Sequence, residues 1–158
     1  MLYLFMGLFA AAAVALDQLT KALVVANIPL FGRVNVIDGL FCLTYTQNTG
    51  AAFSSFEGAR WLFVVIFAVF AAAIIWEFSK KRWPFTTFDR WCIVAIFGGG
   101  LGNTIDRVRL GFVVDMIEVD FMTFPVFNVA DCLICVGCFA LMAHLIFFNR
   151  EFWKEEKK

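Results

Sequence analysis

The sequence predicts a mainly α, polytopic membrane protein with four transmembrane helices and a small β-rich segment on the extracytoplasmic side. Three observations lead to this fold class. Of the 158 residues, 62% are apolar and only 16% are charged, whereas a soluble domain is about 45–50% apolar and about 25% charged. Four uncharged apolar runs recur along the chain, and a stretch rich in β-branched and aromatic residues separates the first two. A soluble core of this size could not bury such an apolar excess.

The four apolar runs cover residues 2–16, 61–76, 91–105 and 132–149. Each is a little shorter than the ~20 residues that a spanning helix needs. We therefore expect the spans to include flanking polar residues, within one integral membrane domain over 1–158. The expected spans are about 2–28, 59–78, 88–106 and 129–149, with a β-rich segment at 31–56 and a tail at 150–158.

The distribution of Lys and Arg predicts the orientation. Eight of these residues lie in the 79–90 connection and the 150–158 tail, against four in 31–60 and 107–128. Because cytoplasmic segments carry the excess of Lys and Arg, we expect both termini in the cytoplasm. The 13 basic and 13 acidic residues balance, so there is no basic footprint for nucleic acid. The first apolar run lacks a basic start and is expected to be retained as a span.

Three acidic residues complete the expected spans at one end of the bundle. In this topology Asp17, Asp106 and Asp131 lie roughly 22–28 Å from the cytoplasmic end of their helices. In a core of ~30 Å they would meet just inside the outer surface. Ionisable side chains at such depth face a bundle interior or a watery cavity. The sequence thus predicts a polar site near the outer leaflet.

Several of these polar residues have a structural alternative. Asp17 and Lys21 are four apart on one helix face and can neutralise each other. Asn103, Asp106 and Arg107 bring an amide, a carboxylate and a guanidinium within about one turn, either as a site or as an Asp106–Arg107 network that ties the helix end to its neighbours. The preceding glycines, at 98–100 and 102, indicate close helix packing.

Two further carboxylates are candidates for chemistry. Asp115 interrupts the apolar stretch 111–117, where desolvation or a second acid would disturb its pKa. Asn128 and Asp131 have the spacing of an N-cap and its N3 partner at the start of the last span. Two carboxylates in one desolvated pocket can act as general acid and general base. Asp115 could also be an acid on a membrane-edge strand that points to water.

Other reactive residues do not form a second site. The single histidine, His144, lies ~20 Å along its helix from Asp131 and is expected to bond to a neighbouring helix. Cys132, Cys135 and Cys138 follow one stripe of an apolar helix, and we expect packed thiols there and no metal. Cys42 and Cys92 fall on opposite sides of the membrane and cannot form a disulfide.

The connections are expected to be simple. Residues 33–55 alternate weakly and predict two or three short strands, with turns at Gly39 and at 48–50. The 79–90 segment carries Pro84 and is expected to be a plain linker.

Five segments, in this order, resemble the signal peptidase II family of lipoprotein signal peptidases. They are Asp17-Gln18-Leu19-Thr20-Lys21, Asn48-Thr49-Gly50-Ala51-Ala52-Phe53, Gly102-Asn103-Thr104-Ile105-Asp106-Arg107, Gly111-Phe112-Val113-Val114-Asp115 and Phe127-Asn128-Val129-Ala130-Asp131. Together they cover most of the chain. Met116 departs from the phenylalanine usual in the family.

The resemblance implies an aspartyl endopeptidase of the bacterial cytoplasmic (inner) membrane. Such an enzyme removes the signal peptide from a diacylglyceryl-modified prolipoprotein by cutting before the lipidated cysteine. It also implies a β-cradle over 31–56, no cofactor, contact with membrane lipids, and activity as a monomer. The catalytic pair implied is Asp115 and Asp131. The implied substrate-binding or dyad-supporting residues are Asn48, Asn103, Arg107, Asn128, Asp17, Lys21 and Asp106, the last as scaffold.

Two other function classes remain open from the residues alone. Intramembrane acids also serve as proton relays, so a small proton-coupled membrane transporter is one alternative. A non-enzymatic assembly factor or anchor is the other, and it would tolerate the change Asp115→Asn.

Overall fold

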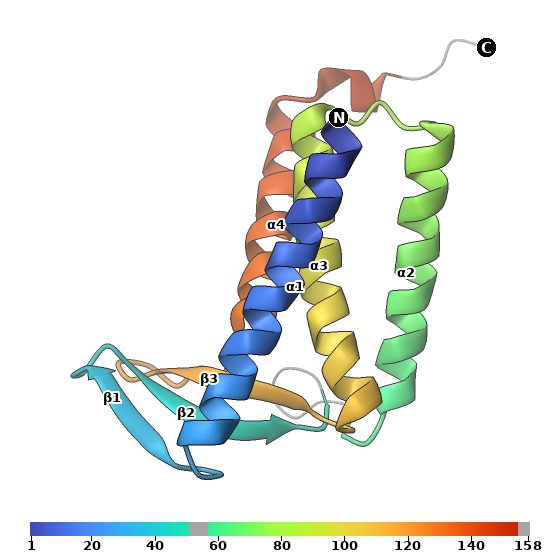
Figure 1. The fold of residues 1–158 in the computed structure, drawn as a ribbon. Helices are drawn as coiled ribbons and strands as arrows, with labels where there is room; N and C mark the ends of the chain where they lie inside the picture. The colour runs from blue at the N-terminus through green and yellow to red at the C-terminus, as the bar shows by residue number, and fades with distance from the viewer. Residues whose placement is uncertain (51–56, 155–158) are drawn as a thin grey trace.

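Four long helices stand side by side, and a small sheet lies across one end of them (Figure 1). The computed structural model describes residues 1–50 and 57–154. The start of α1 and the end of α4 lie at the end of the bundle away from the sheet (Figure 1). The site described below is at the sheet end.

The helices are longer than the apolar runs that predict them. Of the four, α1, α2 and α4 are long and apolar enough to cross a membrane. α3 has four glycines and charged residues near both ends, which lower its hydropathy, so a fourth span at 88–106 stays a prediction. The bounds are α1 Leu2–Asn27, α2 Arg60–Lys80, α3 Thr87–Arg109 and α4 Val129–Phe147, followed by the 3-10 helix η2 Arg150–Trp153.

The expectation that 79–90 is a plain linker is wrong at both ends. α2 continues to Lys80, and α3 already begins at Thr87. The reason is a capping box that the sequence analysis missed. The side chain of Thr86 accepts a hydrogen bond from the Asp89 amide, and Asp89 accepts one from the Thr86 amide. This reciprocal pair satisfies two amides that a helix start leaves without partners.

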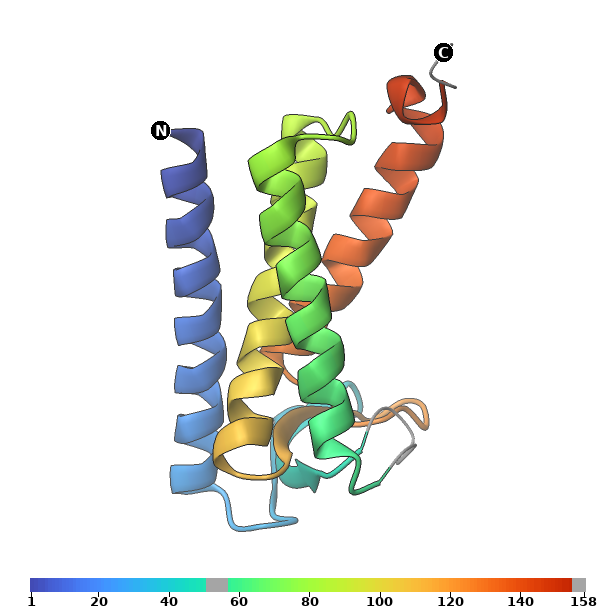
Figure 2. The same cartoon turned by 90° about the vertical axis from the view of Figure 1, so that its right-hand side faces the viewer.

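α3 is the centre of the bundle, because it packs against each of the other three helices. Its glycines permit this approach. A Cβ atom on Gly99 would collide with the backbone oxygen of Ala130, and one on Gly102 would lie 2.5 Å from Asp17 Oδ2. The close packing predicted for this glycine run is confirmed. Figure 2 shows α4 crossing α3 near the sheet and diverging from α1 toward the other end.

The sheet has three antiparallel strands in the order β1-β2-β3. They are β1 Arg33–Ile37, β2 Phe41–Asn48 and β3 Val113–Val119. Two strands therefore lie in the segment predicted over 33–55, of which residues 51–55 fall outside the described part of the chain. The third strand, β3, comes from far along the sequence and was not predicted as part of this sheet.

Alternation along β3 decides where Asp115 points. Val114 and Met116 belong to a small buried cluster with Val24, Ile28 and Tyr45, which joins the end of α1 to the sheet. Successive side chains on a strand face opposite sides. Asp115 therefore points away from this cluster, toward the start of α4. Met116 is 3% exposed and is part of the cluster.

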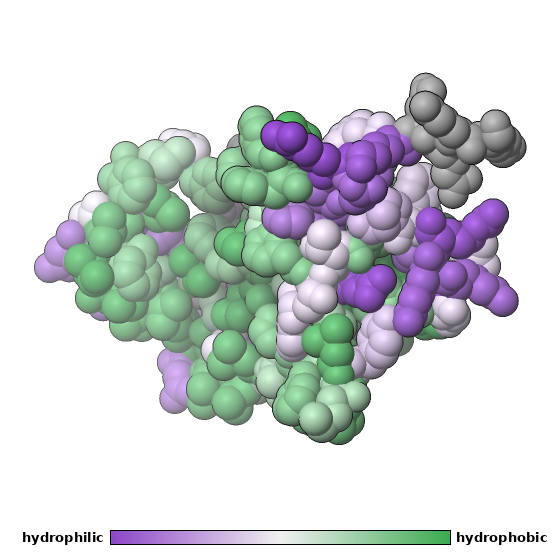
Figure 3. All heavy atoms as spheres, turned by 90° about the horizontal axis from the view of Figure 1, so that it is seen from above, coloured by the Kyte–Doolittle hydropathy of each residue, from purple (hydrophilic) through white to green (hydrophobic). Residues whose placement is uncertain are grey.

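The end away from the sheet is held by polar contacts between helices. Asp89 Oδ1 lies 2.7 Å from His144 Nδ1, which confirms the expected bond from His144 to a neighbouring helix. Asp89 also accepts a hydrogen bond from Asn149 at the end of α4. Seen from this end, hydrophilic residues gather on the side of α2 and the C-terminal segment, whereas the projecting sheet is mostly hydrophobic (Figure 3).

Candidate active site

Two carboxylates lie at the junction of the sheet and the bundle, each held by an asparagine. Asp115, on β3, accepts hydrogen bonds from Asn48 Nδ2 at 2.9 Å and from Asn128 Nδ2 at 2.7 Å. Asp131, in the first turn of α4, accepts one from Asn103 Nδ2 at 2.7 Å. Asp115 is 2% exposed, whereas Asp131 is half-buried. Four separate elements thus supply these two acids and their donors.

Asn128 connects the two carboxylates directly. Its side chain donates to Asp115, and its backbone amide donates to Asp131 Oδ2 at 3.1 Å. Its side-chain oxygen accepts from the Asp131 amide at 3.0 Å, which completes the capping box of α4. The N-cap and N3 positions predicted for these residues are confirmed. The residue that starts the helix therefore contacts both acids, with its side chain at Asp115 and its backbone amide at Asp131.

The environment of Asp115 favours its protonated form. The pKa of this carboxyl is raised from an ordinary value of 3.8 to about 6, because burial and, to a smaller degree, the charge of Asp131 outweigh the hydrogen bonds from Asn48 and Asn128, which lower it. The sequence-based expectation of a disturbed pKa is met, and desolvation is the main cause.

A buried lysine lies behind the two carboxylates. Lys21, only 3% exposed, donates to three oxygens at 2.9 Å. They belong to Asp17, Asp106 and the side-chain amide of Asn103. Because Lys21 occupies the amide oxygen of Asn103, the NH2 group of that amide is directed to Asp131. The Asp17–Lys21 pair expected from their spacing is present, with a second acid added to it.

The expected pairing of Asp106 with Arg107 is wrong. Neighbouring residues on a helix point in different directions, and Asp106 turns inward to Lys21 while Arg107 turns toward the loop after β2. Arg107 Nη2 donates to the backbone oxygen of Gly50 at 2.9 Å, and its guanidinium lies 4.6 Å from the centre of the Phe63 ring. The interpretation of Asp106 as a tie to neighbouring helices holds, but the partner is on α1.

Gln18 is a member of this network that the sequence analysis did not single out. Its Nε2 lies 2.9 Å from Asp106 Oδ1 and 3.2 Å from the backbone oxygen of Gly102. Gln18 follows Asp17 in the first of the five segments that resemble the family, and this position is the sequence feature that could have identified it. Asp17 itself is completely buried and accepts from the Ala130 amide at 3.0 Å. These contacts join α1 to both α3 and α4.

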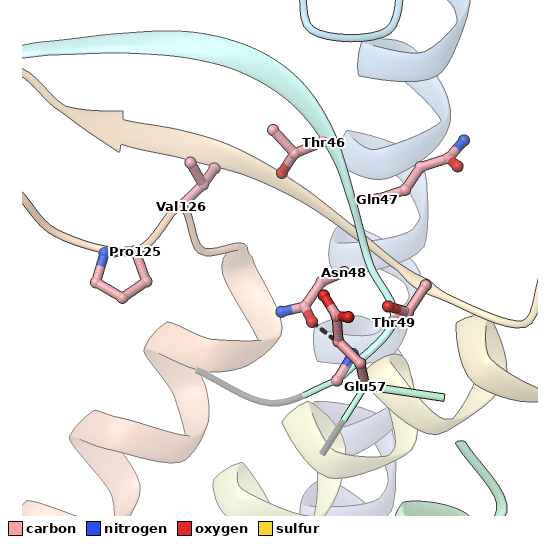
Figure 4. A pocket seen from close by; sticks show the side chains of 8 residues that line it. Thr46, Gln47, Asn48, Thr49, Glu57, Pro125 and Val126 are labelled. Carbon is pink, nitrogen blue, oxygen red and sulfur yellow. Dashed lines mark hydrogen bonds between the residues drawn. The ribbon is translucent and has the colours of Figure 1, made fainter. Parts of the chain in front are cut away.

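A cleft opens beside the first carboxylate. It has a volume of about 280 Å³ and is lined by residues 46–50 at the end of β2, by Glu57, and by Pro125 and Val126. Figure 4 shows Asn48 in the middle of this cleft, with Pro125 and Val126 on one side and Thr49 on the other. Neither Asp115 nor Asp131 lines the cleft itself, but Asn48 lines it and donates to Asp115, so one side chain connects the cleft to the acid.

Two carboxylates of unequal exposure, joined by one asparagine, can divide the roles of acid and base. The buried one keeps its proton up to a pH of about 6, well above the range of an ordinary carboxyl, and the half-buried one is accessible to water. Within residues 1–50 and 57–154 no group of three or more His, Cys, Asp or Glu side chains is arranged to hold a metal ion.

Both the sequence and the fold of this chain match those of known proteins. Residues 9–147 match the model of a family described as signal peptidase (SPase) II. The chain belongs to the signal peptidase II family.

Individual members of this family match nearly the whole chain. The lipoprotein signal peptidase of Streptococcus thermophilus is 42% identical over 149 residues, which are 92% of this chain and 90% of that protein. The lipoprotein signal peptidase of Enterococcus faecalis is 41% identical over 143 residues, or 88% of this chain and 86% of that protein.

Two solved structures have the same fold. Both are described as bacterial membrane enzymes, at 2.3 Å and 1.9 Å resolution, and both are 30% identical to this chain. The first has a TM-score of 0.86 and covers 98% of this chain and 93% of that chain. The second has a TM-score of 0.82, with 91% and 94% covered. This signal peptidase II family member is thus a bacterial membrane peptidase, and the transporter and anchor alternatives are set aside.

Proposed function

We propose that this chain is an intramembrane aspartyl endopeptidase that removes the signal peptide from diacylglyceryl-modified prolipoproteins by cutting before the lipidated cysteine. Asp115 and Asp131 form its catalytic dyad. The observation that carries the proposal is the pair of carboxylates joined by Asn128, one buried with a pKa of about 6 and one half-buried, beside a cleft. The family's lipoprotein signal peptidases supply the substrate class.

In the proposed reaction Asp131 is the base and Asp115 the acid. Asp131 takes a proton from a water molecule, whose oxygen bonds to the scissile carbonyl carbon. Protonated Asp115 hydrogen-bonds the developing oxyanion. When the C–N bond breaks, Asp115 gives its proton to the leaving amine of the lipidated cysteine, and the proton that Asp131 took from water then restores the single proton of the dyad on Asp115. The two carboxylates and water are the only groups that this scheme uses.

The neighbouring residues hold the dyad in place in this scheme. Asn48 and Asn128 orient Asp115, and Asn103 orients Asp131. Lys21 fixes Asn103, while Asp17 and Asp106 balance the charge of the buried lysine. A separate contact, from Arg107 to the Gly50 carbonyl, supports the loop that borders the cleft.

The proposed location of the dyad in the membrane follows from the expected orientation of the chain. With both termini cytoplasmic, the sheet and the dyad lie at the outer leaflet of the bacterial cytoplasmic membrane, next to the site where an apolar signal helix ends. We also propose that the chain acts as a monomer.

The test is cleavage of a diacylglyceryl-modified prolipoprotein by purified protein in detergent, with the product identified by mass. Asp115→Asn and Asp131→Asn are each expected to lose about 10²–10⁴-fold in turnover, which is what a positioned acid or base contributes. Glu118→Gln, on the same strand as Asp115, is the matched control and should cleave normally. Thermal unfolding checks that every variant is folded.

Two results would contradict this scheme. A folded Asp115→Asn variant that cleaves at the wild-type rate would remove Asp115 from the dyad. An Asp106→Asn variant as inactive as Asp131→Asn, with unchanged unfolding temperature, would move the second catalytic role to Asp106.

A further inference from the structure

An apolar groove lies between α1 and α2 at the opposite end of the bundle from the proposed dyad. α2 packs mainly against α3, and the groove occupies the space that this leaves beside α1. Its volume of about 370 Å³ is within the ~300–1,000 Å³ range of small-ligand sites. Its lining includes Gly7 and Ala10 of α1, Ile74 and Phe78 of α2, and Val94 and Phe97 of α3.

At the mouth of the groove, two cationic side chains lie beside the same tyrosine, Tyr3. Tyr3 lines the groove, and its ring centre lies 6.0 Å from that of Phe78 across it. Lys81 Nζ lies 5.8 Å from the centre of the Tyr3 ring, and Arg90 Nη1 lies 3.5 Å from the Tyr3 hydroxyl. Elements α2 and α3 therefore each bring one positive charge to the place where the apolar groove reaches the bundle end.

The acidic residues nearest to these cations in sequence are both buried. Glu77 Oε1 accepts a hydrogen bond from the Trp83 amide at 3.0 Å, and its Oε2 has no hydrogen-bond partner among the described residues. Asp89 is fully buried among Thr86, His144 and Asn149. Neither Lys81 nor Arg90 has a carboxylate within ion-pair distance among the described residues. The mouth thus presents positive charge above an apolar groove.

We propose that this groove is a binding site for an anionic phospholipid, with one acyl chain between α1 and α2 and the phosphate at Lys81 and Arg90. Basic pockets between transmembrane helices bind anionic lipid head groups in this way. The site is separate from the proposed dyad and does not depend on the peptidase reaction.

The depth of the groove favours a lipid over a substrate helix. Its lining on α1 runs from Tyr3 to Ala10, which is roughly 10 Å along the helix. That length suits the upper part of an acyl chain, whereas a membrane-spanning signal helix would need a groove along the ~30 Å core. Signal peptides also begin with a basic segment, which Lys81 and Arg90 would repel.

Gly7 gives a way to fill the groove without disturbing the packing. A Cβ atom built on Gly7 meets nothing within 4 Å. The change Gly7→Leu therefore adds a side chain to the lining of the groove at a position where its Cβ atom meets no neighbour. It removes the space for the acyl chain while leaving both cations in place.

The experiment is native mass spectrometry of the delipidated full-length protein with equal amounts of phosphatidylglycerol and phosphatidylcholine of the same acyl chains. The wild type is expected to retain phosphatidylglycerol in preference. Lys81→Gln and Arg90→Gln should each reduce that preference roughly fivefold, as one surface cation is worth about 1 kcal/mol toward an anionic lipid. Arg150→Gln, an exposed cation at the same end of the bundle, is the matched control and should change nothing.

The Gly7→Leu variant is tested in the same experiment and should reduce retention of both lipids. Unfolding temperatures without lipid verify that each variant is folded. Equal retention of the two lipids by the wild type, or an unchanged preference in both cation variants, would overturn the proposal. So would a Gly7→Leu variant that keeps its lipid but has a raised KM for prolipoprotein, because the groove would then hold the substrate helix.

Discussion

At Asp115, burial and two asparagines act on the pKa in opposite directions. Burial raises the pKa, the hydrogen bonds from Asn48 and Asn128 lower it, and the resulting value is about 6. If Asp115 is the acid of the dyad, kcat/KM falls as the pH rises through this value, because the required proton is lost above it. The pH profile of kcat/KM in detergent measures this decrease, which is the alkaline limb of the profile.

Asn48→Ala is expected to move that alkaline limb to higher pH. Removing the Asn48 amide takes away a donor that stabilises the carboxylate, so the pKa of Asp115 rises. The maximum rate should also fall, since Asp115 loses one of its two orienting bonds. A limb that stays in place, or moves to lower pH, would assign it to another group.

Lys21 is a residue whose loss we expect to damage the whole fold. Lys21→Met leaves the buried carboxylates of Asp17 and Asp106 without their shared cation. Breaking a buried ion pair from one side costs about 3–5 kcal/mol. Thermal or chemical unfolding in detergent measures the loss. The matched change Lys154→Met removes a lysine from an exposed pair with Glu151 and should leave the unfolding temperature unchanged.

At the scale of elements, the contact between α3 and α4 depends on the absence of side chains. Gly99→Ala would bring a Cβ atom against the Ala130 backbone oxygen and within 2.9 Å of Ile134 Cγ1. Because a backbone atom cannot move aside cheaply, we expect a loss of about 1–3 kcal/mol. Since Ala130 adjoins Asp131, turnover should fall as well.

Gly7→Ala is the control for that change. It lies in a helix of the same bundle with open space around it. Alanine is also the better helix former, by about 1 kcal/mol. Unfolding midpoints of the two variants in one detergent give the comparison. Equal midpoints would mean that α3 and α4 can separate without cost.

The sequence predicts elements well where the cause is local, and poorly where it is distant. The apolar runs predict the helices, and the spacing of Asn128 and Asp131 predicts the cap of α4, because both depend on neighbours along the chain. β3 was not predicted as part of the sheet, since its partner β2 lies about seventy residues earlier. Similarly, Asp106 was assigned to adjacent Arg107, while its partner Lys21 is on another helix.

The residues of the candidate site were predicted, but the hydrogen bonds that connect them were not. Counting residues along the spans brought Asp17, Asp106 and Asp131 to one end. The resemblance selected Asp115 and Asp131 as the pair. Neither approach could say that an asparagine joins the two acids, or that Lys21 sets the direction of Asn103. Those facts depend on side-chain geometry across three helices and a sheet.

At the scale of the whole molecule, the positions of the two ends define which side of the membrane the sheet occupies. We expect the C-terminus in the cytoplasm and the turn at Gly39 outside. Alkaline phosphatase fused after Lys158 should be inactive in intact cells, and the same reporter inserted at the exposed Gly39 should be active. An active reporter at both positions would contradict an even number of spans and remove α3 as the fourth.

Asn128 both caps α4 and contacts the two acids, and this affects how heat inactivates the enzyme. The first turn of α4 and the contacts to the two acids depend on the same residue, through its side chain and its backbone amide. Helix ends fray before helix centres, and local openings need less free energy than global unfolding. Fraying of this one turn would release both acids while the rest of the bundle stays intact. Catalysis should therefore stop several degrees below the temperature at which the helices themselves melt.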